Sequence, residues 1–259
     1  MQKIDCAKYA DEILESVKAV PNKKELVIFT AGNDPASASY MRGKLKDGEK
    51  CGVPVSVVKV ESQQELISRI RLANKADNVG GIIVQLPLPK GFNADEACRA
   101  IYLDKDVDGF QPDSKFVPCT PEGIMHILIR EGVLIPGKSV LLIGKGKLVG
   151  KPLIDLLLGC GMTLTIAHSQ TENLDRLLMT HHDVVITAVG KPKLVDLRVT
   201  NADVVIDAGI NRDENGKLCG DCYGFNELDS RSIRVTTVPG GVGLMTRAML
   251  MKHIGEASE

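Results

Sequence analysis

The chain has 259 residues, 44% of them hydrophobic, which is enough to bury a core without disulfides or a structural metal. Acidic and basic residues almost balance at a formal net charge of −1, and no lysine or arginine run occurs, so the sequence lacks the electrostatic footprint of a nucleic-acid or membrane-surface binder. We therefore expect a small-molecule ligand, with no nucleic-acid and no membrane partner.

Targeting and redox signals are also missing from the sequence. No apolar run reaches membrane-spanning length, and residues 1–20 carry charges at helical spacing rather than the apolar centre of a signal peptide. The seven cysteines are an odd number scattered along the chain, which fits reduced thiols. Only Cys219 and Cys222 lie close together, and a single C-x-x-C lacks the second ligand pair of a zinc site, so we interpret them as unpaired loop thiols. We expect a cytoplasmic protein without a metal.

Short apolar runs alternate with helical patterns in the first third of the chain. The pattern predicts helices through about residue 50 and over 62–75, between strands at LVIFTAG (26–32), VSVVKV (55–60) and GGIIVQ (80–85). Strands with apolar residues on both faces, separated by helices, indicate a parallel sheet built from βαβ units.

A loop-rich segment follows from 86 to 120, rich in proline, glycine and aspartate around one short predicted helix, NADEACRAI (93–101). At its end Thr120 is suited to cap a helix and Pro121 to its first position, which predicts a helix running to about Glu131. The segment separates two lobes.

The strand and helix alternation then restarts. Helices are predicted from about 149 and over 172–178, and a glycine-rich loop enters a final helix within 236–253. The predicted strands are SVLLIG (139–144), TLTIA (163–167), DVVITAVG (183–190) and DVVIDAG (203–209). We therefore predict an α/β fold of two lobes, 1–120 and a Rossmann-like 121–244, with a helix of about 245–259 packing back on the first lobe and a cleft between the lobes.

The loop GKGKLVGKP joins a strand to a helix and contains Gly144, Gly146 and Gly150. Such glycines allow backbone to approach a diphosphate, which a helix N-terminus attracts. Their spacing is one residue longer than the standard dinucleotide fingerprint, so a plain turn competes with this interpretation. The next strand ends in TIAHSQT without the carboxylate that holds a ribose 2′-hydroxyl, and Lys145 and Lys151 lie in the loop, which favours NADP, with NAD as the alternative.

Tyr40 and Lys44 share one face of a predicted helix, with Ser37 one turn earlier. Lysine can lower the pKa of a tyrosine that donates a proton, or can itself transfer protons while the ring supplies a stacking surface. Short-chain dehydrogenases use the first arrangement, but their glycine-rich turn precedes the pair, whereas here it follows. A lysine lying over a half-buried tyrosine is the structural alternative. Gln85 and Asp108 in nearby loops favour a site.

Eight ordered motifs, from about residue 26 to 254, resemble the bifunctional methylenetetrahydrofolate dehydrogenase/methenyltetrahydrofolate cyclohydrolase family. The motifs are DPASASYMRGKLKDGEKCGV, GGIIVQLPLP, DKDVDGF, PCTPEG, GKGKLVGKP, AHSQT, DVVIDAGI and VPGGVGLMT. The resemblance implies a homodimeric enzyme of one-carbon metabolism that acts on tetrahydrofolate derivatives. It would oxidise 5,10-methylenetetrahydrofolate with NAD(P)⁺ and hydrolyse the methenyl product to 10-formyltetrahydrofolate, a one-carbon donor for purine biosynthesis.

The resemblance also assigns roles to residues. Tyr40 would stack on the folate rings, Lys44 would be the acid/base group tuned by Gln85, and Asp108 would bind the N–H donors of the pterin. Further folate contacts are implied at Leu86, Pro87, Pro239, Gly240 and Gly241. Cofactor contacts are implied at Gly144, Lys145, Gly146, Val149, Gly150, His168, Ser169, Ala188, Gly190, Gly209 and Ile210.

Departures from the family pattern all lie on the cofactor side. GKG stands where GRS is usual, which replaces a guanidinium fork by a point charge. Thr237 and Leu244 stand where prolines are usual, and we expect them to loosen the loop near the nicotinamide. These departures leave two alternatives open, a cyclohydrolase with weak or no dehydrogenase activity and a folate- or nucleotide-binding module without turnover.

Overall fold

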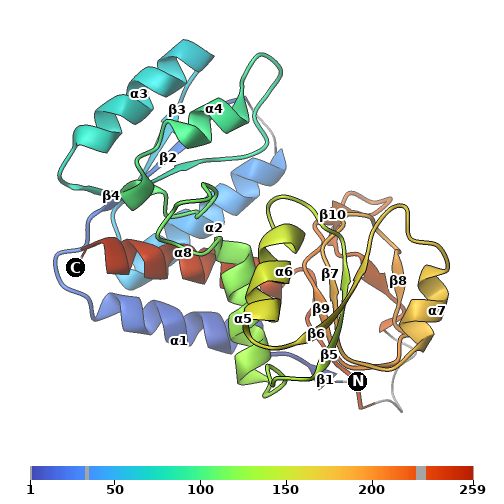
Figure 1. Ribbon diagram of the computed structural model, residues 1–259. Helices are drawn as coiled ribbons and strands as arrows, with labels where there is room; N and C mark the ends of the chain where they lie inside the picture. The colour runs from blue at the N-terminus through green and yellow to red at the C-terminus, as the bar shows by residue number, and fades with distance from the viewer. Residues whose placement is uncertain (1, 33–34, 226–231, 259) are drawn as a thin grey trace. The chain divides into compact units, whose positions relative to one another are not determined.

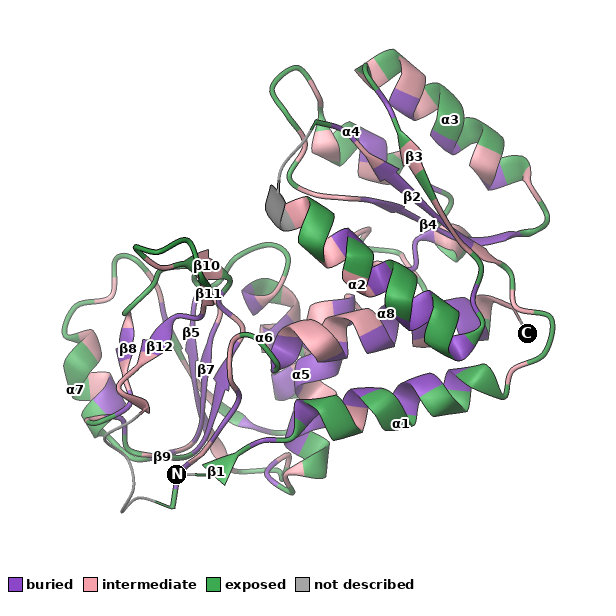
Figure 2. Ribbon diagram, turned by 180° about the vertical axis from the view of Figure 1, so that it is seen from behind, coloured by how far each residue is buried: buried purple, intermediate pink, exposed green. Residues whose placement is uncertain are grey.

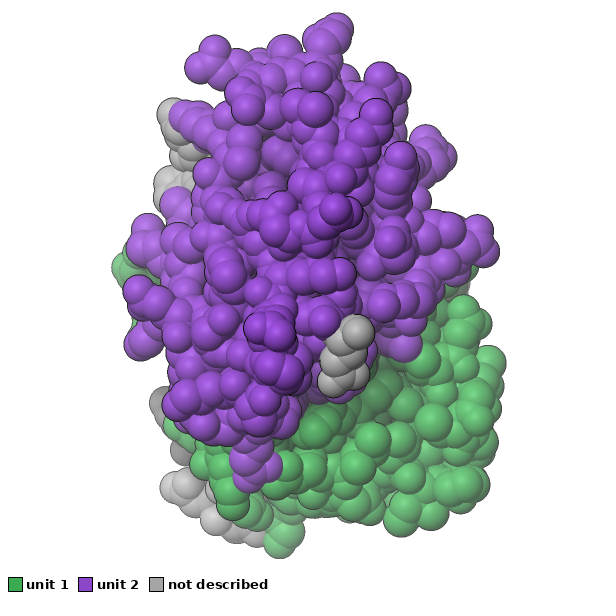
Figure 3. Space-filling model, turned by 90° about the vertical axis from the view of Figure 1, so that its left-hand side faces the viewer, with its two compact units in different colours: residues 1–9, 120–246 green, residues 10–119, 247–259 purple. Residues whose placement is uncertain are grey.

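The chain folds into two α/β units (Figure 1). The computed structural model describes residues 2–32, 35–225 and 232–258, so Asp34 of the DPASASY motif lies outside the described residues. Unit 1 comprises residues 1–9 and 120–246, and unit 2 comprises residues 10–119 and 247–259 (Figure 3). The two-domain α/β class predicted from the sequence is confirmed, and each unit is described by itself below.

Unit 2 is built on a three-stranded parallel sheet of order β3-β2-β4. Its strands are β2 (Glu25–Thr30), β3 (Val55–Lys59) and β4 (Val79–Val84). Its helices are α2 (Pro35–Cys51), α3 (Gln63–Lys75), α4 (Ala94–Arg99), the 3₁₀ turn η1 (Leu103–Lys105), and the greater parts of α1 (Cys6–Lys18) and α8 (Val242–Ser258). The strands and helices predicted for residues 26 to 101 are therefore present.

Strands β2 and β4 are buried on both faces, as their purple colour in Figure 2 shows, whereas the edge strand β3 is only partly buried. On one face Val27 and Phe29 join a cluster with Leu66 of α3 and Ala97 of α4. The side chains of Ser62 and Asn93 cap these two helices. Each accepts a hydrogen bond from the backbone N–H of the residue three positions later, Glu65 and Glu96 respectively. α8 reaches the sheet at Gly81 of β4, where a Cβ atom would lie 2.3 Å from Cδ1 of Ile254. Glycine there is what lets the C-terminal helix pack so closely.

Unit 1 contains a six-stranded parallel sheet of order β1-β13-β9-β7-β5-β6. The strands are β1 (Gln2–Lys3), β5 (Ser139–Ile143), β6 (Thr163–Ala167), β7 (His182–Thr187), β9 (Ala202–Asp207) and β13 (Arg234–Val235). Helices α5 (Cys119–Arg130), α6 (Gly150–Gly159) and α7 (Leu174–Met179) accompany the sheet. Because β6 and β7 lie on opposite sides of β5, the strand order reverses at β5 and creates a ligand-binding position at its carboxyl end.

Three features differ from the sequence analysis. Residues 1–9, which we assigned to the first lobe, group with unit 1, because β1 pairs with β13 at the sheet edge. Thr120 is not an N-cap, because α5 begins at Cys119, and its hydroxyl instead lies 3.0 Å from the hydroxyl of Thr246. Six short strands of unit 1 were not predicted, namely β1, β13, β8 (Val195–Asp196), β10 (Asn211–Arg212), β11 (Leu218–Cys219) and β12 (Cys222–Tyr223).

The seven cysteines, which all lie within the described ranges, form no disulfide bond. Cys219 and Cys222 lie on β11 and β12 rather than in an open loop. None of the helices in the described part of the chain combines the length and the apolar character needed to cross a bilayer.

Candidate active site

The helical spacing of Tyr40 and Lys44 places both side chains on one face of α2. The Lys44 side chain is buried, with 5% of its surface exposed, and its ammonium lies 5.2 Å from the centre of the Tyr40 ring. Lys44 Nζ also donates a hydrogen bond of 3.0 Å to Oε1 of Gln85. The three residues expected to act together therefore do lie together.

Gln85 follows β4 and is held from both ends. Its backbone N–H donates to the carbonyl of Phe29, and its side-chain Nε2 donates to the carbonyl of Leu86 at 2.8 Å. Because Nε2 is used in this way, Oε1 is the atom presented to Lys44. The expected folate contacts Leu86 and Pro87 follow Gln85 directly in the chain, and Pro87 is exposed and joined to Leu86 by a cis peptide bond.

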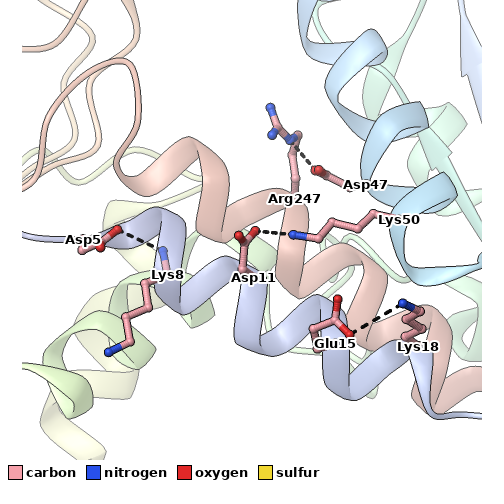
Figure 4. A network of polar contacts seen from close by, with 8 residues as sticks. All are labelled: Asp5, Lys8, Asp11, Glu15, Lys18, Asp47, Lys50 and Arg247. Carbon is pink, nitrogen blue, oxygen red and sulfur yellow. Dashed lines mark hydrogen bonds and ion pairs between the residues drawn. The ribbon is translucent and has the colours of Figure 1, made fainter.

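Burial lowers the pKa of the Lys44 amine below its usual range. The charge of Asp108 and the thiol of Cys119 oppose this shift, while the positive charge of Arg247 adds to it. Arg247 itself is held by Asp47 of α2 through a hydrogen bond of 2.6 Å from Nε to Oδ2 (Figure 4). The site thus contains a lysine that releases its proton more easily than an exposed one.

Asp108 lies after η1 in a tight turn. Burial raises the pKa of its carboxyl group, and the positive charges of Lys44 and His253 together with the Cys119 thiol partly offset that rise. The backbone N–H of Cys119 donates to the carbonyl of Asp108 at 3.4 Å. Gly109 follows with φ +71°, and a Cβ there would lie 2.6 Å from the carbonyl oxygen of Phe116, so the turn requires glycine.

Two residues that the sequence analysis did not assign to the site, His253 and Cys119, contact the backbone of this turn. His253 of α8 is 1% exposed, stacks on Phe116 at 4.6 Å between ring centres, and has Nδ1 2.7 Å from the carbonyl oxygen of Val107. A carbonyl oxygen only accepts, so Nδ1 carries the proton and donates. The thiol of Cys119 contacts the same carbonyl at 3.3 Å and lies 3.6 Å from Nδ1. His253 and Cys119 therefore fix the residue that precedes Asp108.

These groups are suited to proton transfer beside a cationic or polar heterocycle. Because burial lowers its pKa, the Lys44 amine is a better base near neutral pH than an ordinary lysine with a pKa of about 10.4. The Tyr40 ring offers an apolar face, and the Asp108 carboxyl group offers acceptors for N–H donors.

The glycine-rich loop of unit 1 forms the bare backbone turn that a diphosphate requires. Gly144 has φ +106°, and a Cβ there would lie 2.5 Å from the carbonyl oxygen of Ala188. A Cβ on Gly150, at the start of α6, would lie 2.1 Å from the carbonyl oxygen of Gly144. Gly146 and Lys145 are exposed at the turn. A Cβ on Gly146 would meet no atom within 4 Å, so the loop presents bare backbone near this helix N-terminus and fits a dinucleotide cofactor.

The other expected cofactor residues lie at the carboxyl ends of strands of the same sheet. His168 and Ser169 follow β6 in a compact turn, in which the His168 backbone N–H donates to the Thr171 hydroxyl at 2.9 Å. Gly190 follows β7, and Gly209 and Ile210 follow β9. Val149 precedes Gly150 at the start of α6. The parallel sheet thus brings all of these residues of unit 1 to one edge.

The VPGGVG loop also belongs to unit 1 and leads into α8. Gly240 has φ +99°, and a Cβ on Gly241 would lie 2.4 Å from the carbonyl oxygen of Thr237. We expected Thr237 to loosen this loop, but its hydroxyl donates to the carbonyl of Pro239 at 3.0 Å. Leu244 likewise donates its backbone N–H to Gly241 within the first turn of α8. Thr237 and Leu244, the two departures from the family pattern, thus each form a hydrogen bond within this segment.

One cluster in the described ranges has the residue types of a metal site, namely His181, Asp183 and Asp203 at the amino ends of β7 and β9. Asp183 there already binds the ammonium of Lys138 at 2.5 Å and both donors of Ser139. Its carboxylate is therefore engaged within the sheet, and we assign no function to this cluster.

Comparisons with known proteins match both units. Residues 4–108 match the family model of the tetrahydrofolate dehydrogenase/cyclohydrolase catalytic domain, and residues 118–259 match its NAD(P)-binding domain. The chain is 40% identical to the bifunctional protein FolD of Agathobacter rectalis, over 95% of this chain and 94% of that protein. It is 39% identical to the bifunctional protein FolD of Lactococcus lactis, over 95% and 90%.

Solved structures give the same result. The bifunctional methylenetetrahydrofolate dehydrogenase/cyclohydrolase of Campylobacter jejuni matches with a TM-score of 0.92 at 34% identity, covering 100% of this chain and 98% of that one. The Trypanosoma brucei enzyme, solved with NADP and an inhibitor, matches with a TM-score of 0.90 at 28% identity, covering 98% and 96%.

Proposed function

Because the chain belongs to the tetrahydrofolate dehydrogenase/cyclohydrolase family, it is a methylenetetrahydrofolate dehydrogenase and methenyltetrahydrofolate cyclohydrolase, and we propose that Lys44 transfers the protons of the hydrolytic step. The observation that carries this proposal is the buried Lys44 amine, which donates to Gln85 Oε1 at 3.0 Å and has a lowered pKa. Mere binding of a folate has no need of such an amine.

In the hydrolysis, water adds to the cationic carbon that bridges two nitrogens of the methenyl compound. The neutral amine of Lys44 takes the proton that this water loses, which leaves a hydroxyl group on the carbon. One carbon–nitrogen bond then breaks as the Lys44 ammonium returns its proton to the departing nitrogen, and the hydroxyl group loses its proton to solvent, which forms the formyl C=O and releases one proton overall. The products are 10-formyltetrahydrofolate and the original amine, so Lys44 is regenerated.

The dehydrogenase step needs binding and orientation more than acid/base chemistry. Bound NAD(P)⁺ supplies the acceptor for the hydride of the methylene carbon. In our proposal the Tyr40 ring supports the folate rings and Asp108 accepts from pterin N–H groups, which fixes the substrate for both steps. Pro239, Gly240 and Gly241 would approach it through backbone, since the glycine pair of that loop presents no side chain beyond Cα.

NADP is the cofactor we propose within the NAD(P) class. Two observations support it. The turn after β6, residues 168–171, offers no carboxylate to hold a ribose 2′-hydroxyl, and Lys145 lies in the glycine-rich loop, while Lys151, which we expected in the loop, lies in the first turn of α6. The Trypanosoma brucei relative was solved with NADP.

Further parts of the proposal concern the setting of the enzyme. We propose a cytoplasmic homodimer that requires no metal and binds neither nucleic acid nor membranes. The nearly balanced charge supports the absence of nucleic-acid and membrane partners, and cysteines without disulfides support the cytoplasmic location. The family resemblance supports the dimer. Sedimentation of the purified chain at micromolar concentration tests the oligomeric state, and a monomer would contradict it.

The variant Lys44→Met tests the catalytic role of Lys44. We expect methenyl hydrolysis, followed by loss of methenyl absorbance, to fall to the uncatalysed rate, while folate binding stays within about one order of magnitude. The same absorbance band, followed with NADP⁺ and NAD⁺ in turn, gives the dehydrogenase activity and the cofactor preference. Hydrolysis at the wild-type rate in Lys44→Met would overturn the assignment.

A further inference from the structure

Asp221, in the middle of the CGDC motif, is a buried carboxylate that the reaction described above does not use. It is 0% exposed and lies between β11 and β12. Within the described residues it accepts five hydrogen bonds. Its Oδ2 accepts from Thr187 Oγ1 (2.8 Å), Val189 N (2.9 Å) and Gly190 N (3.3 Å), and its Oδ1 accepts from Lys191 N (2.8 Å) and Asn211 Nδ2 (2.9 Å).

A second buried carboxylate, Asp207, ends β9 beside it and is 1% exposed. Its Oδ1 accepts from the backbone N–H groups of Gly209 at 2.9 Å and Asp221 at 3.0 Å. Its Oδ2 accepts from the backbone N–H of Cys222 at 2.9 Å. The two carboxylates thus form one connected network that reaches the chain after β7 and the chain after β9.

Two glycines, Gly209 and Gly220, pack directly against these carboxylates. A Cβ on Gly209 would lie 2.1 Å from Oδ1 of Asp221, and a Cβ on Gly220 would lie 2.0 Å from Oδ2 of Asp207. No side chain other than hydrogen fits at either position without moving the network. Burying a carboxylate is costly unless donors surround it, so the donors and the carboxylates hold each other in one arrangement.

The loops that this network holds carry four of the residues we assign to the cofactor. Ala188 and Gly190 lie in the loop after β7, and Gly209 and Ile210 lie in the loop after β9. The adenosine half of a dinucleotide binds on the side of the strand that follows the glycine-rich loop, which here is β6. The nicotinamide half would then lie on the other side of β5, toward the loops after β7 and β9.

We infer that Asp221 and Asp207 are positioning residues that preform the loops at 188–191 and 208–210 to receive the nicotinamide riboside half of NAD(P). This inference rests on the proposed cofactor contacts. The carboxylates act only through the backbone they hold, so they set the affinity for the nucleotide and leave the hydrolytic groups of unit 2 untouched.

The variant Asp221→Asn is the direct test. Whichever way the new amide is turned, its NH₂ group faces at least two donors, so at least one backbone N–H of the loop at 189–191 loses its acceptor. We expect the Kd for NADP⁺, measured by calorimetry on the full chain, to rise at least about tenfold. Methenyl hydrolysis should stay within about twofold of wild type, because Lys44, Gln85 and Asp108 belong to the other unit.

Hydrogen exchange without any cofactor gives a readout that does not depend on the cofactor assignment. In Asp221→Asn the amides of Val189, Gly190 and Lys191 should exchange faster than in wild type, while those of the β5 core should not. Faster exchange with an unchanged Kd for NADP⁺ would overturn the inference and leave the proposed function intact. Wild type that binds neither NADP⁺ nor NAD⁺ would instead refute the cofactor assignment itself.

Asn211→Ala serves where Asp221→Asn fails to fold, because it removes one donor and leaves the carboxylate with its other partners. We expect a rise of a few-fold in the Kd for NADP⁺ with hydrolysis unchanged. Thr187→Val is the matched variant on the other carboxylate oxygen and should behave alike. A fall of hydrolysis and NADP⁺ binding in parallel in these variants would show a general structural role and overturn the inference.

Discussion

Lys44 Nζ lies 3.0 Å from Gln85 Oε1, and this hydrogen bond is the point at which helix α2 meets the chain that leaves β4. A neutral amide accepts from the amine without adding charge, so burial can keep the pKa of Lys44 lowered. A carboxylate at the same position would reverse this effect. The identity of residue 85 therefore sets the protonation state of the proposed base.

Gln85→Glu should slow hydrolysis by holding Lys44 protonated. An opposite charge within hydrogen-bond distance commonly raises a lysine pKa by about one unit or more, so we expect about a tenfold loss of methenyl hydrolysis at pH 7. The acid limb of the pH–rate profile should move to higher pH. Gln85→Leu is the control, since it removes the acceptor without adding charge and should lower the rate without moving that limb upward. An unshifted limb in Gln85→Glu would argue against Lys44 as the base.

Lys44 should also make the stability of the protein depend on pH. Its pKa is lowered in the folded chain from an ordinary value of 10.5, so between the two values the unfolded chain binds more protons than the folded chain. The free energy of unfolding contributed by Lys44 therefore rises with pH across that window. The raised pKa of Asp108 acts in the opposite sense, lowering stability as pH rises from 3.8 to its folded value.

Urea unfolding at pH 8 and pH 10 checks the Lys44 contribution, using wild type and Lys44→Met side by side. We expect wild type to gain more free energy of unfolding between these two values than the variant does, because methionine does not titrate. The other lysines and the tyrosines titrate in both proteins and cancel in the difference. An equal gain in both proteins would show that the Lys44 amine is not penalised by folding.

His253→Leu should weaken substrate binding through the Asp108 turn. Leucine cannot donate to the carbonyl of Val107, so the turn loses a buried hydrogen bond worth about 1–3 kcal/mol of stability. We expect the KM of methenyl hydrolysis to rise more than kcat falls, since Asp108 moves while Lys44 and Gln85 stay. His253→Asn keeps a donor and should restore most of the KM. Equal losses in both variants would mean that packing on Phe116 matters, not the hydrogen bond.

Local sequence patterns were sufficient for the part of the site that lies within single elements. Tyr40 and Lys44 are four residues apart on one helix, and Gln85 ends a strand, so helical spacing and the edge rule for parallel sheets bring them to notice. Asp108 lies in a segment that its proline, glycine and aspartate content marks as a loop. Each of these needs at most one step from spacing to geometry.

Cys119, His253, Asp207 and Asp221 could not be found in that way. His253 contacts a thiol 134 residues away in the chain, and its helix reads as an ordinary apolar segment with scattered charges. The chain between Asp207 and Asp221 contains β10 and β11, and β12 follows Asp221. Each of these strands is only two residues long, too short for a sequence pattern to reveal. The one available signal is an acid next to glycine, in DAG and in CGDC, and in CGDC the C-x-x-C spacing of the cysteines is the more prominent pattern. Burial of a carboxylate depends on tertiary packing, which spacing does not reveal.

The glycine-rich loop offers a matched pair of substitutions. A Cβ on Gly150 would lie 2.1 Å from the Gly144 carbonyl oxygen, whereas a Cβ on Gly146 would meet no atom within 4 Å. Gly150→Ala should therefore shift the strand and helix apart, lowering the melting temperature of unit 1 and weakening NADP⁺ binding. Gly146→Ala should leave the melting temperature unchanged, yet it adds a methyl group at the exposed backbone where the diphosphate is proposed to lie, so NADP⁺ affinity should still fall. Calorimetric unfolding and NADP⁺ titration of both variants separate the two effects. If Gly146→Ala bound NADP⁺ as tightly as wild type, the diphosphate would not approach this turn. The extra residue in the glycine spacing would then indicate a different binding position for the cofactor.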